Sequence, residues 1–205
     1  YDRHNLYVGF RCYDSEPAKV INRLDRRGKI FPSDWISFYI DPHHDHRTGY
    51  TFATTPGGIQ SDGYRYDDTN SDRNWRGIWW VESQIDDEGW TAEFKIPFAN
   101  FRFPEGKDQV WGFDIERLNK RKNEWTVWKQ MTQAGVYTGM SDLGHAVGFT
   151  DIESGKLFEV TPYALGGASK TSDQDADRQG AIGLDLQYNL TPALKANLTV
   201  NPDFA

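Results

Sequence analysis

Closely spaced side-chain oxygens near the middle of the sequence could bind a cation. Asp68, Asn70 and Asp72 stand at every second position, which is the spacing that opens a calcium loop of the EF-hand type. That loop needs glycine at its sixth position and glutamate at its twelfth, where this sequence has Arg73 and Trp79. An EF-hand is therefore excluded. The alternatives are an irregular structural calcium site and a turn rich in Asp and Asn.

Histidines and further carboxylates are the other groups that could act on a ligand. Asp41, Asp45 and the three histidines around them could bind zinc or copper, but consecutive histidines point apart, so a solvated turn is the simpler interpretation. Asp114 and Glu116 share one face of a predicted strand, and Glu93 lies on the polar face of another. Such pairs could hydrolyse glycosides. Solvated sheet faces commonly supply them, and the sequence has no nucleophile motif, so no catalytic residue is assigned.

Aromatic rings are the more informative group, because they make up 15% of the chain and include eight tryptophans. Trp35 and Tyr39 alternate with the apolar residues of one predicted strand, and Trp80 lies opposite the apolar residues of another. If the apolar face is core, the opposite face displays large flat rings on which sugars can stack their C–H faces. The alternative is that loops cover this face too and the rings serve packing.

Apolar residues recur at every second position, so the elements that carry these groups are predicted to be strands. Turns rich in Gly, Pro and Asp separate them, which favours an antiparallel β-sandwich. Residues 66–77 are predicted to be a loop, and residues 86–89 a hairpin turn. The predicted strands are 5–13, 34–41, 50–54, 59–65, 78–85, 90–96, 111–116 and 125–129.

The pattern changes after about residue 150. Predicted strands at 158–166, 182–190 and 194–200 each have one apolar and one polar face. Strands of roughly 9–11 residues with this alternation are typical of outer-membrane β-barrels. A half-buried sheet of a soluble domain shows the same alternation, so the pattern alone leaves both interpretations open.

Length and composition exclude several classes of protein. The chain has 205 residues, 38% hydrophobic residues and a formal net charge of −7. No apolar run approaches the ~18 residues of a membrane helix, and the acidic balance argues against nucleic acid as a partner. Cys12 is the single cysteine, which excludes an intrachain disulfide and a cysteine-built zinc site. Because the sequence begins at Tyr1 and ends without a terminal signal, we expect a fragment cut at both ends.

The chain contains, in this order, NLYVGFRCYD, SDWISFYIDPHHDHRTGYTFATTPGGIQSD, DEGWTAEFKIPFANFRFP and QVWGFDIER. These segments resemble the family 9 carbohydrate-binding modules, in the divergent branch found at the N-terminus of large bacterial outer-membrane proteins. The tail, KLFEVTPYALGG followed by NLTPALKANLTVNPDFA, resembles the start of the barrel domain of unknown function that follows that module.

The resemblance implies an all-β chain of two domains. Residues 1–150 are expected to form an antiparallel β-sandwich without its N-terminal strands. Residues 151–205 are expected to form the first strands of a truncated transmembrane β-barrel. The resemblance also implies that the chain is located at the Gram-negative outer membrane. The turn 190–193 is short and the loop 169–180 is long, and short barrel turns face the periplasm, so the sandwich is expected there.

The implied function is noncatalytic binding of a polysaccharide or oligosaccharide, in carbohydrate catabolism associated with O-glycosyl hydrolysis. Some members hold structural calcium. Ser37 and Phe31 stand where sugar-binding members carry an acidic residue and a tryptophan, whereas Arg47 belongs to a recurrent motif of the branch. The candidate carbohydrate-binding residues are Trp35, Tyr39, Trp80 and Arg47, and the candidate calcium ligands are Asp68, Asn70 and Asp72.

Two alternatives to sugar binding stay open. The sandwich could be a structural or assembly domain of an outer-membrane barrel that binds no sugar. The full-length protein could instead be a glycoside hydrolase that uses Asp114, Glu116 or Glu93. The missing catalytic motifs disfavour the hydrolase, and the departures at Ser37 and Phe31 keep the structural role open.

Overall fold

The computed structural model describes residues 1–104, 106, 108–129, 139–153, 158–169, 177–191 and 194–201. The chain divides into two compact units, residues 1–154 and 155–205, and each is described by itself. The regular elements are antiparallel strands with three short 3₁₀ turns, at Pro17–Lys19, Phe98–Asn100 and Met140–Asp142. The predicted all-β, antiparallel fold is confirmed.

The first unit contains a three-stranded sheet of β1 (Asn5–Tyr13), β7 (Gly89–Pro97) and β6 (Trp80–Asp86), in the order β1-β7-β6. The predicted hairpin joins β6 to β7, where Asp86 pairs with Gly89. A Cβ atom at Gly89 would lie 2.1 Å from the Cys12 carbonyl oxygen, so this turn requires glycine. Cys12 itself is buried, and burial raises the pKa of its thiol to about 11, as suits a small core residue.

The second sheet of this unit has seven strands. They are β2 (Trp35–Asp41), β3 (Gly49–Thr54), β4 (Gln60–Tyr66), β5 (Asn70–Asp72), β8 (Asp108–Asn119), β9 (Glu124–Val127) and β10 (Gly144–Thr150). Their order is β10-β8-β2-β3-β4-β5, and β9 pairs with β8. The sequence did not predict β5 and β10.

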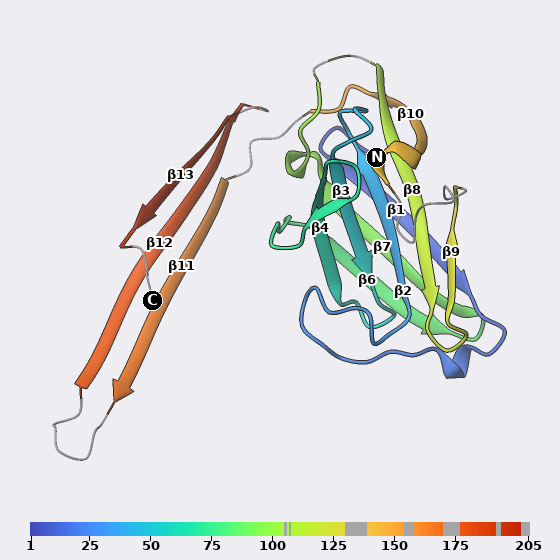
Figure 1. The fold of residues 1–205 in the computed structure, drawn as a ribbon, viewed down its shortest axis with the longest axis horizontal. Helices are drawn as coiled ribbons and strands as arrows, with labels where there is room; N and C mark the ends of the chain where they lie inside the picture. Colours follow the sequence, from blue (N-terminus) through green and yellow to red (C-terminus); the bar gives the residue numbers. More distant parts are fainter. Residues whose placement is uncertain are drawn as a thin grey trace. The chain divides into compact units, whose positions relative to one another are not determined.

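The two sheets pack face to face around an aromatic core (Figure 1). Phe38 and Phe52 of the larger sheet stack with ring centroids 5.6 Å apart, and Phe94 of the smaller sheet meets Phe38 edge-on at 5.3 Å. Such contacts fix the two layers because aromatic rings bury large areas and prefer defined angles. The alternation in β2 is as predicted, with Phe38 on the core face and its neighbour Tyr39 on the other.

The second face of β2 is covered as well, since every residue of this strand is buried. Ile30, from the segment that leads into β2, packs with Trp35. Met140 and Leu143 pack with Tyr39. The alternative in which chain segments cover this face is therefore right for β2, and the rings do not form an open platform.

The second unit is an antiparallel meander of β11 (Phe158–Ser169), β12 (Asp177–Thr191) and β13 (Leu194–Val200). The three strands occur where the alternation predicts them, although β11 and β12 are longer. Within the described residues, no helix has the length and apolar character needed to cross a membrane.

Candidate functional site

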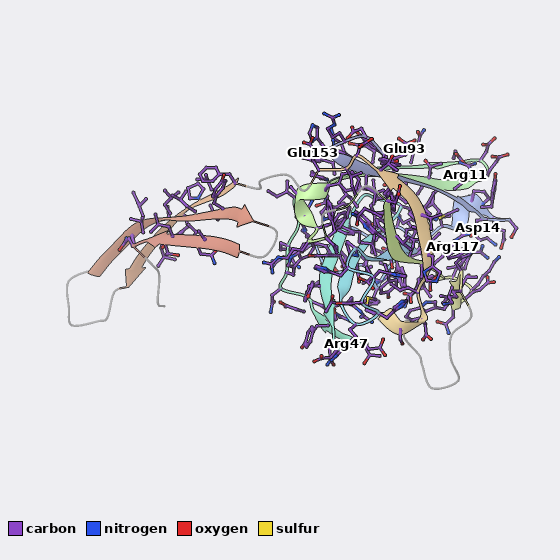
Figure 2. The ribbon with its side chains drawn as sticks, turned by 90° about the horizontal axis from the view of Figure 1, so that it is seen from above. Arg11, Asp14, Arg47, Glu93, Arg117 and Glu153 are labelled. Carbon is purple, nitrogen blue, oxygen red and sulfur yellow. The ribbon has the colours of Figure 1, made fainter. Side chains whose placement is uncertain are left out.

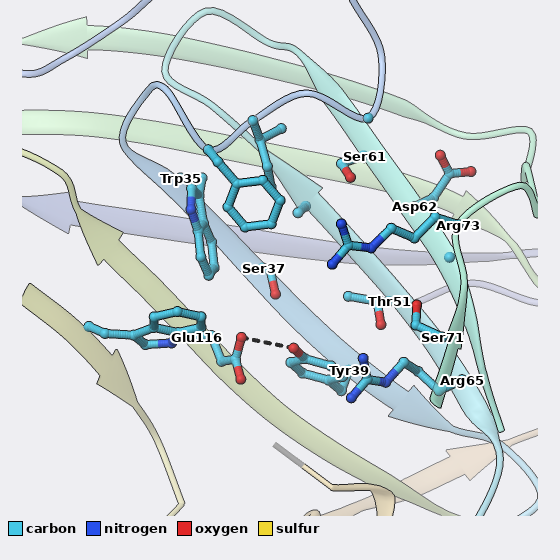
Figure 3. Close-up of a pocket in the computed structure, with 16 residues that line it drawn as sticks. Trp35, Ser37, Tyr39, Thr51, Ser61, Asp62, Arg65, Ser71, Arg73 and Glu116 are labelled. Carbon is cyan, nitrogen blue, oxygen red and sulfur yellow. Dashed lines mark hydrogen bonds between the residues drawn. The ribbon is translucent and has the colours of Figure 1, made fainter. Parts of the chain in front are cut away.

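The face of the seven-stranded sheet that points away from the core contains a hollow (Figure 3). Side chains alternate along a strand, so residues 35, 37 and 39 of β2 all belong to this face. Strand pairing extends it sideways: Ser37 lies opposite Glu116 of β8 and Ala53 of β3, and Ala53 lies opposite Ser61 of β4. One row of side chains therefore runs across four neighbouring strands.

Short side chains form the floor of the hollow. Ser37, Ala53 and Ser61 occupy the central row, and Thr51 pairs with Gly63 in the next one. Longer side chains surround these residues, so the floor is recessed. The space above the floor, about 650 Å³, includes open solvent, so the hollow is open and not an enclosed cavity.

Three aromatic rings form one wall. Trp35 packs edge-on between Phe31 and Trp125, with ring centroids 6.4 and 5.4 Å away. Trp35 is only 3% exposed, whereas Phe31 is 46% and Trp125 39% exposed. The two outer rings therefore offer apolar surface to a ligand, and Trp35 supports them from below.

The opposite end of the hollow is polar and charged. The Tyr39 hydroxyl donates a hydrogen bond of 2.8 Å to Glu116 Oε2, and the Arg65 guanidinium lies 5.4 Å from the centre of the Tyr39 ring (Figure 3). Burial raises the pKa of Tyr39, and the Glu116 carboxylate raises it further. The phenol therefore stays protonated and orients the carboxylate.

Hydroxyl groups on the floor form no hydrogen bonds with other described residues. Within the described part of the chain, Thr51 Oγ1 is buried without a hydrogen-bond partner, and no protein partner is recorded for the hydroxyls of Ser37 and Ser61. Buried polar groups are normally satisfied, so these oxygens favour a polar ligand or water in the hollow. Aromatic walls, hydroxyls and a charged end together suit a molecule with an apolar face and several hydroxyl groups.

The sequence-predicted carbohydrate-binding residues are only partly brought together. Trp35 and Tyr39 line the hollow. Trp80 belongs to the other sheet, where it is 54% exposed and Lys95 Nζ lies 5.7 Å from its ring centre. Arg47 lies in the turn between β2 and β3, near the edge of the unit in Figure 2, and pairs with Asp67. Trp80 and Arg47 are therefore not part of the hollow.

The predicted calcium ligands make other contacts. The Asp68 carboxylate accepts hydrogen bonds from the Ser141 backbone N–H (2.9 Å) and hydroxyl (3.2 Å). Asp72 accepts one from the Asn74 backbone N–H, and Asn70 begins β5. Within the described residues, no group of three or more His, Cys, Asp or Glu side chains is arranged to hold a metal ion. Calcium binding here stays a prediction.

The histidines lie closer together than the sequence predicts. His44 Nε2 lies 2.8 Å from Nδ1 of His145, and the ring centroids of His44 and His46 are 4.6 Å apart. Sequence reasoning could not include His145, because it belongs to the unpredicted strand β10. The partly buried cluster lowers the pKa of His44, first through desolvation and then through repulsion by the other two rings.

The expectation of a solvated face for Asp114 and Glu116 is wrong. Each is 1% exposed, because chain segments cover this face of the sheet. The Asp114 carboxylate accepts hydrogen bonds from the backbone N–H groups of Ile115 and Lys129. Glu93 belongs to the other sheet and lies at the surface in Figure 2. The three candidates for acid–base chemistry thus do not share one site.

Several residues that line the hollow were not predicted from the sequence, among them Arg65, Arg73 and Trp125. Arg65 and Arg73 lie on or next to β4 and β5, and Trp125 is in β9. The sequence pattern that could have predicted the hollow is the run of small and polar residues at alternate positions of β3 and β4, because such residues leave room above a sheet. Reading it requires the strand order, which the sequence alone did not supply.

Comparisons with known proteins support the fold. No family model matches the sequence, and no curated protein matches it. A similar solved structure is a protein from Bacteroides uniformis ATCC 8492 described as a "putative carbohydrate-binding protein". The TM-score is 0.53 at 12% sequence identity, over 70% of this chain and 71% of that chain. At this identity the similarity shows a shared fold.

Proposed function

We propose that residues 1–154 form a noncatalytic carbohydrate-binding module whose ligand occupies the hollow on the seven-stranded sheet. The main observation in support of this proposal is the recessed, hydroxyl-lined floor between the Phe31–Trp125 wall and the Tyr39–Glu116 pair. The resemblance to family 9 carbohydrate-binding modules supports the proposal. The description of the Bacteroides uniformis protein points the same way.

The chemistry of the hollow fits a sugar ring. Its apolar C–H face would rest on Trp125 or Phe31, where an aromatic contact contributes about 0.5–1.5 kcal/mol beyond burial. Its hydroxyls would meet Ser37, Ser61 and the Glu116 carboxylate, with about 0.5–1.5 kcal/mol for a neutral hydrogen bond and about 1.5–3 kcal/mol for one to a charged group.

The carboxylates of the hollow support binding without hydrolysis. Glycoside hydrolysis needs two of them that flank the bond and are free to act. Glu116 accepts the Tyr39 hydroxyl, and the side chain of Asp62, which is 0% exposed, pairs with Arg27 and accepts the Gly77 N–H. The alternative of a hydrolase therefore requires residues outside this site.

We also propose that β11–β13 begin an outer-membrane β-barrel that anchors the module on the periplasmic side, in carbohydrate catabolism. The register supports this, because Val160 pairs with Leu186 and Leu186 pairs with Leu198, so one face of the sheet is apolar. Ile182 (78%) and Leu198 (58%) are largely exposed on that face. Lipid would cover such a face in a membrane barrel.

The test is calorimetric titration of the 205-residue chain with a panel of neutral and acidic oligosaccharides, in a detergent without a sugar headgroup. A Ser61→Phe variant fills the floor from a position that faces away from the core. An exposed position on β9, Thr126, gives the matched control Thr126→Phe, because it lies outside the hollow.

We expect at least one oligosaccharide to bind the wild type and the Thr126→Phe control, and Ser61→Phe to lose that binding. Absence of binding across the panel would contradict the proposal and favour a structural or assembly role. Binding that survives in Ser61→Phe would place the ligand elsewhere on the sandwich.

A further inference from the structure

One arginine at the hollow forms no ion pair with a carboxylate of the described residues. Arg73 follows β5, is exposed, and its guanidinium lies 5.6 Å from the centre of the Phe31 ring. Figure 3 shows it extending over the recessed floor from the β5 side. In the part of the chain that the structure describes, Arg11, Arg27 and Arg121 each form an ion pair with a carboxylate, whereas Arg73 forms none.

The other charges of the hollow compensate one another. Glu116 and Arg65 lie on either side of Tyr39, the first through the hydroxyl and the second over the ring. Asp62 is held by Arg27 through two hydrogen bonds of 3.0 and 2.8 Å. Among the described residues that line the hollow, Arg73 is therefore the charge left without an opposite partner, and it gives the hollow a local positive excess in a chain whose formal net charge is −7.

From this arrangement, and resting on the proposed sugar site, we propose that the hollow selects acidic saccharides and that Arg73 binds their anionic group. A uronic acid is the best match, because its planar carboxylate can accept two parallel hydrogen bonds from the guanidinium fork. Arg73 lies over the Phe31 ring, so the carboxylate and the stacked sugar ring would occupy adjoining positions. A sulfate ester supplies the same charge with tetrahedral geometry.

The experiment compares ligands that differ only in charge. Oligogalacturonate and its fully methyl-esterified form share a backbone, so their ratio of Kd values isolates the carboxylate. A sulfated galactan oligosaccharide and its desulfated form provide the second arm. Each is titrated into the wild-type 205-residue chain and into the variants Arg73→Gln, Arg73→Lys and Arg47→Gln. The last is the control, because it removes the same charge outside the hollow.

We expect wild type and Arg47→Gln to bind oligogalacturonate roughly tenfold more tightly than its methyl ester, as for one charge-assisted contact of about 1.4 kcal/mol. In Arg73→Gln the two forms should bind equally, with the affinity for the ester retained. Arg73→Lys should keep part of the preference, because it keeps the charge without the fork.

Four results would overturn the inference in distinguishable ways. Equal binding of acid and ester by the wild type would remove the selectivity and leave the sugar site standing. If Arg73→Gln and Arg47→Gln lost the preference for the acid over the ester equally, the preference would come from the overall charge of the chain and not from Arg73. If only the sulfated galactan bound more tightly than its uncharged form, the anionic group that Arg73 binds would be a sulfate ester and not a uronate. Binding of none of the four ligands, together with no binding across the wider panel, would remove the proposed function itself.

Discussion

Single residues at the polar end of the hollow are charged and kept out of water. Glu116 is 1% and Arg65 8% exposed, and an unpaired ion at such depth costs several kcal/mol. Tyr39 lies between them, with its hydroxyl bonded to Glu116 and its ring against Arg65. These contacts fix the polar groups in place, which would lower the entropy lost if the proposed ligand binds there.

The histidine cluster should make the protein sensitive to mild acid. The pKa of His44 is lowered by desolvation and by His46 and His145, while Asp41 acts in the opposite direction. The unfolded chain therefore binds this proton more readily. The stability contributed by neutral His44 is present above the ordinary pKa of about 6.5 and is lost as the pH falls through the lower folded value.

The check is an NMR titration of the histidine rings, combined with urea unfolding between pH 8 and pH 5. In His145→Gln the pKa of His44 should rise and the loss of stability on acidification should become smaller, because one repelling ring is gone. A His44 pKa at or above its ordinary value in the wild type would contradict the described cluster.

At this scale the sequence predicted part of the site. Alternation along β2 was enough to place Trp35 and Tyr39 on the face opposite Phe38, because that rule is local. It could not exclude Trp80, which has the same pattern but belongs to the other sheet. Arg65 and Arg73 enter the hollow only through the pairing of β3, β4 and β5, which depends on contacts distant in sequence.

Elements were predictable where apolar alternation is unbroken. β1, β2 and β7 occur within one or two residues of their predicted bounds. β5 escaped prediction because its residues, Asn70–Asp72, are turn formers that adopt strand geometry by pairing with the edge of β4. β10 escaped because its register shifts between Val147 and Phe149, where Gly148 has a φ of 91°.

The three-stranded sheet β11–β13 should aggregate in water if it begins a membrane barrel. Its exposed apolar face and unpaired edges would drive association, which detergent would prevent. The double variant Ile182→Lys/Leu198→Lys should reduce aggregation, because it breaks the face that we assign to lipid. Thr199→Lys, on the other face of β13, is the matched control and should change little.

Light scattering with and without detergent measures this directly. A wild-type chain that stays monodisperse without detergent would contradict the barrel assignment and favour a larger soluble domain.

Across the whole molecule, one sandwich serves two purposes through the two faces of one sheet. The inner face of the seven-stranded sheet packs Phe38 and Phe52 against the smaller sheet, which makes the support rigid. The outer face carries the recessed floor that we propose as the ligand site, so residues there can change without disturbing the core. The two-layer architecture followed from turn spacing and alternation. The location of the hollow did not, because it depends on which strands are neighbours.

The most direct test of the central claim is an NMR titration of the 205-residue chain, with tryptophan indoles labelled with ¹⁵N, using the tightest oligosaccharide from the panel. The eight tryptophans report on different parts of the molecule. Trp125 and Trp35 line the hollow, Trp80 lies exposed on the other sheet, and Trp90 is buried in the core. We expect the indole signals of Trp125 and Trp35 to shift on binding and those of Trp80 and Trp90 to stay in place. Shifts centred on Trp80, with Trp125 and Trp35 unmoved, would contradict it.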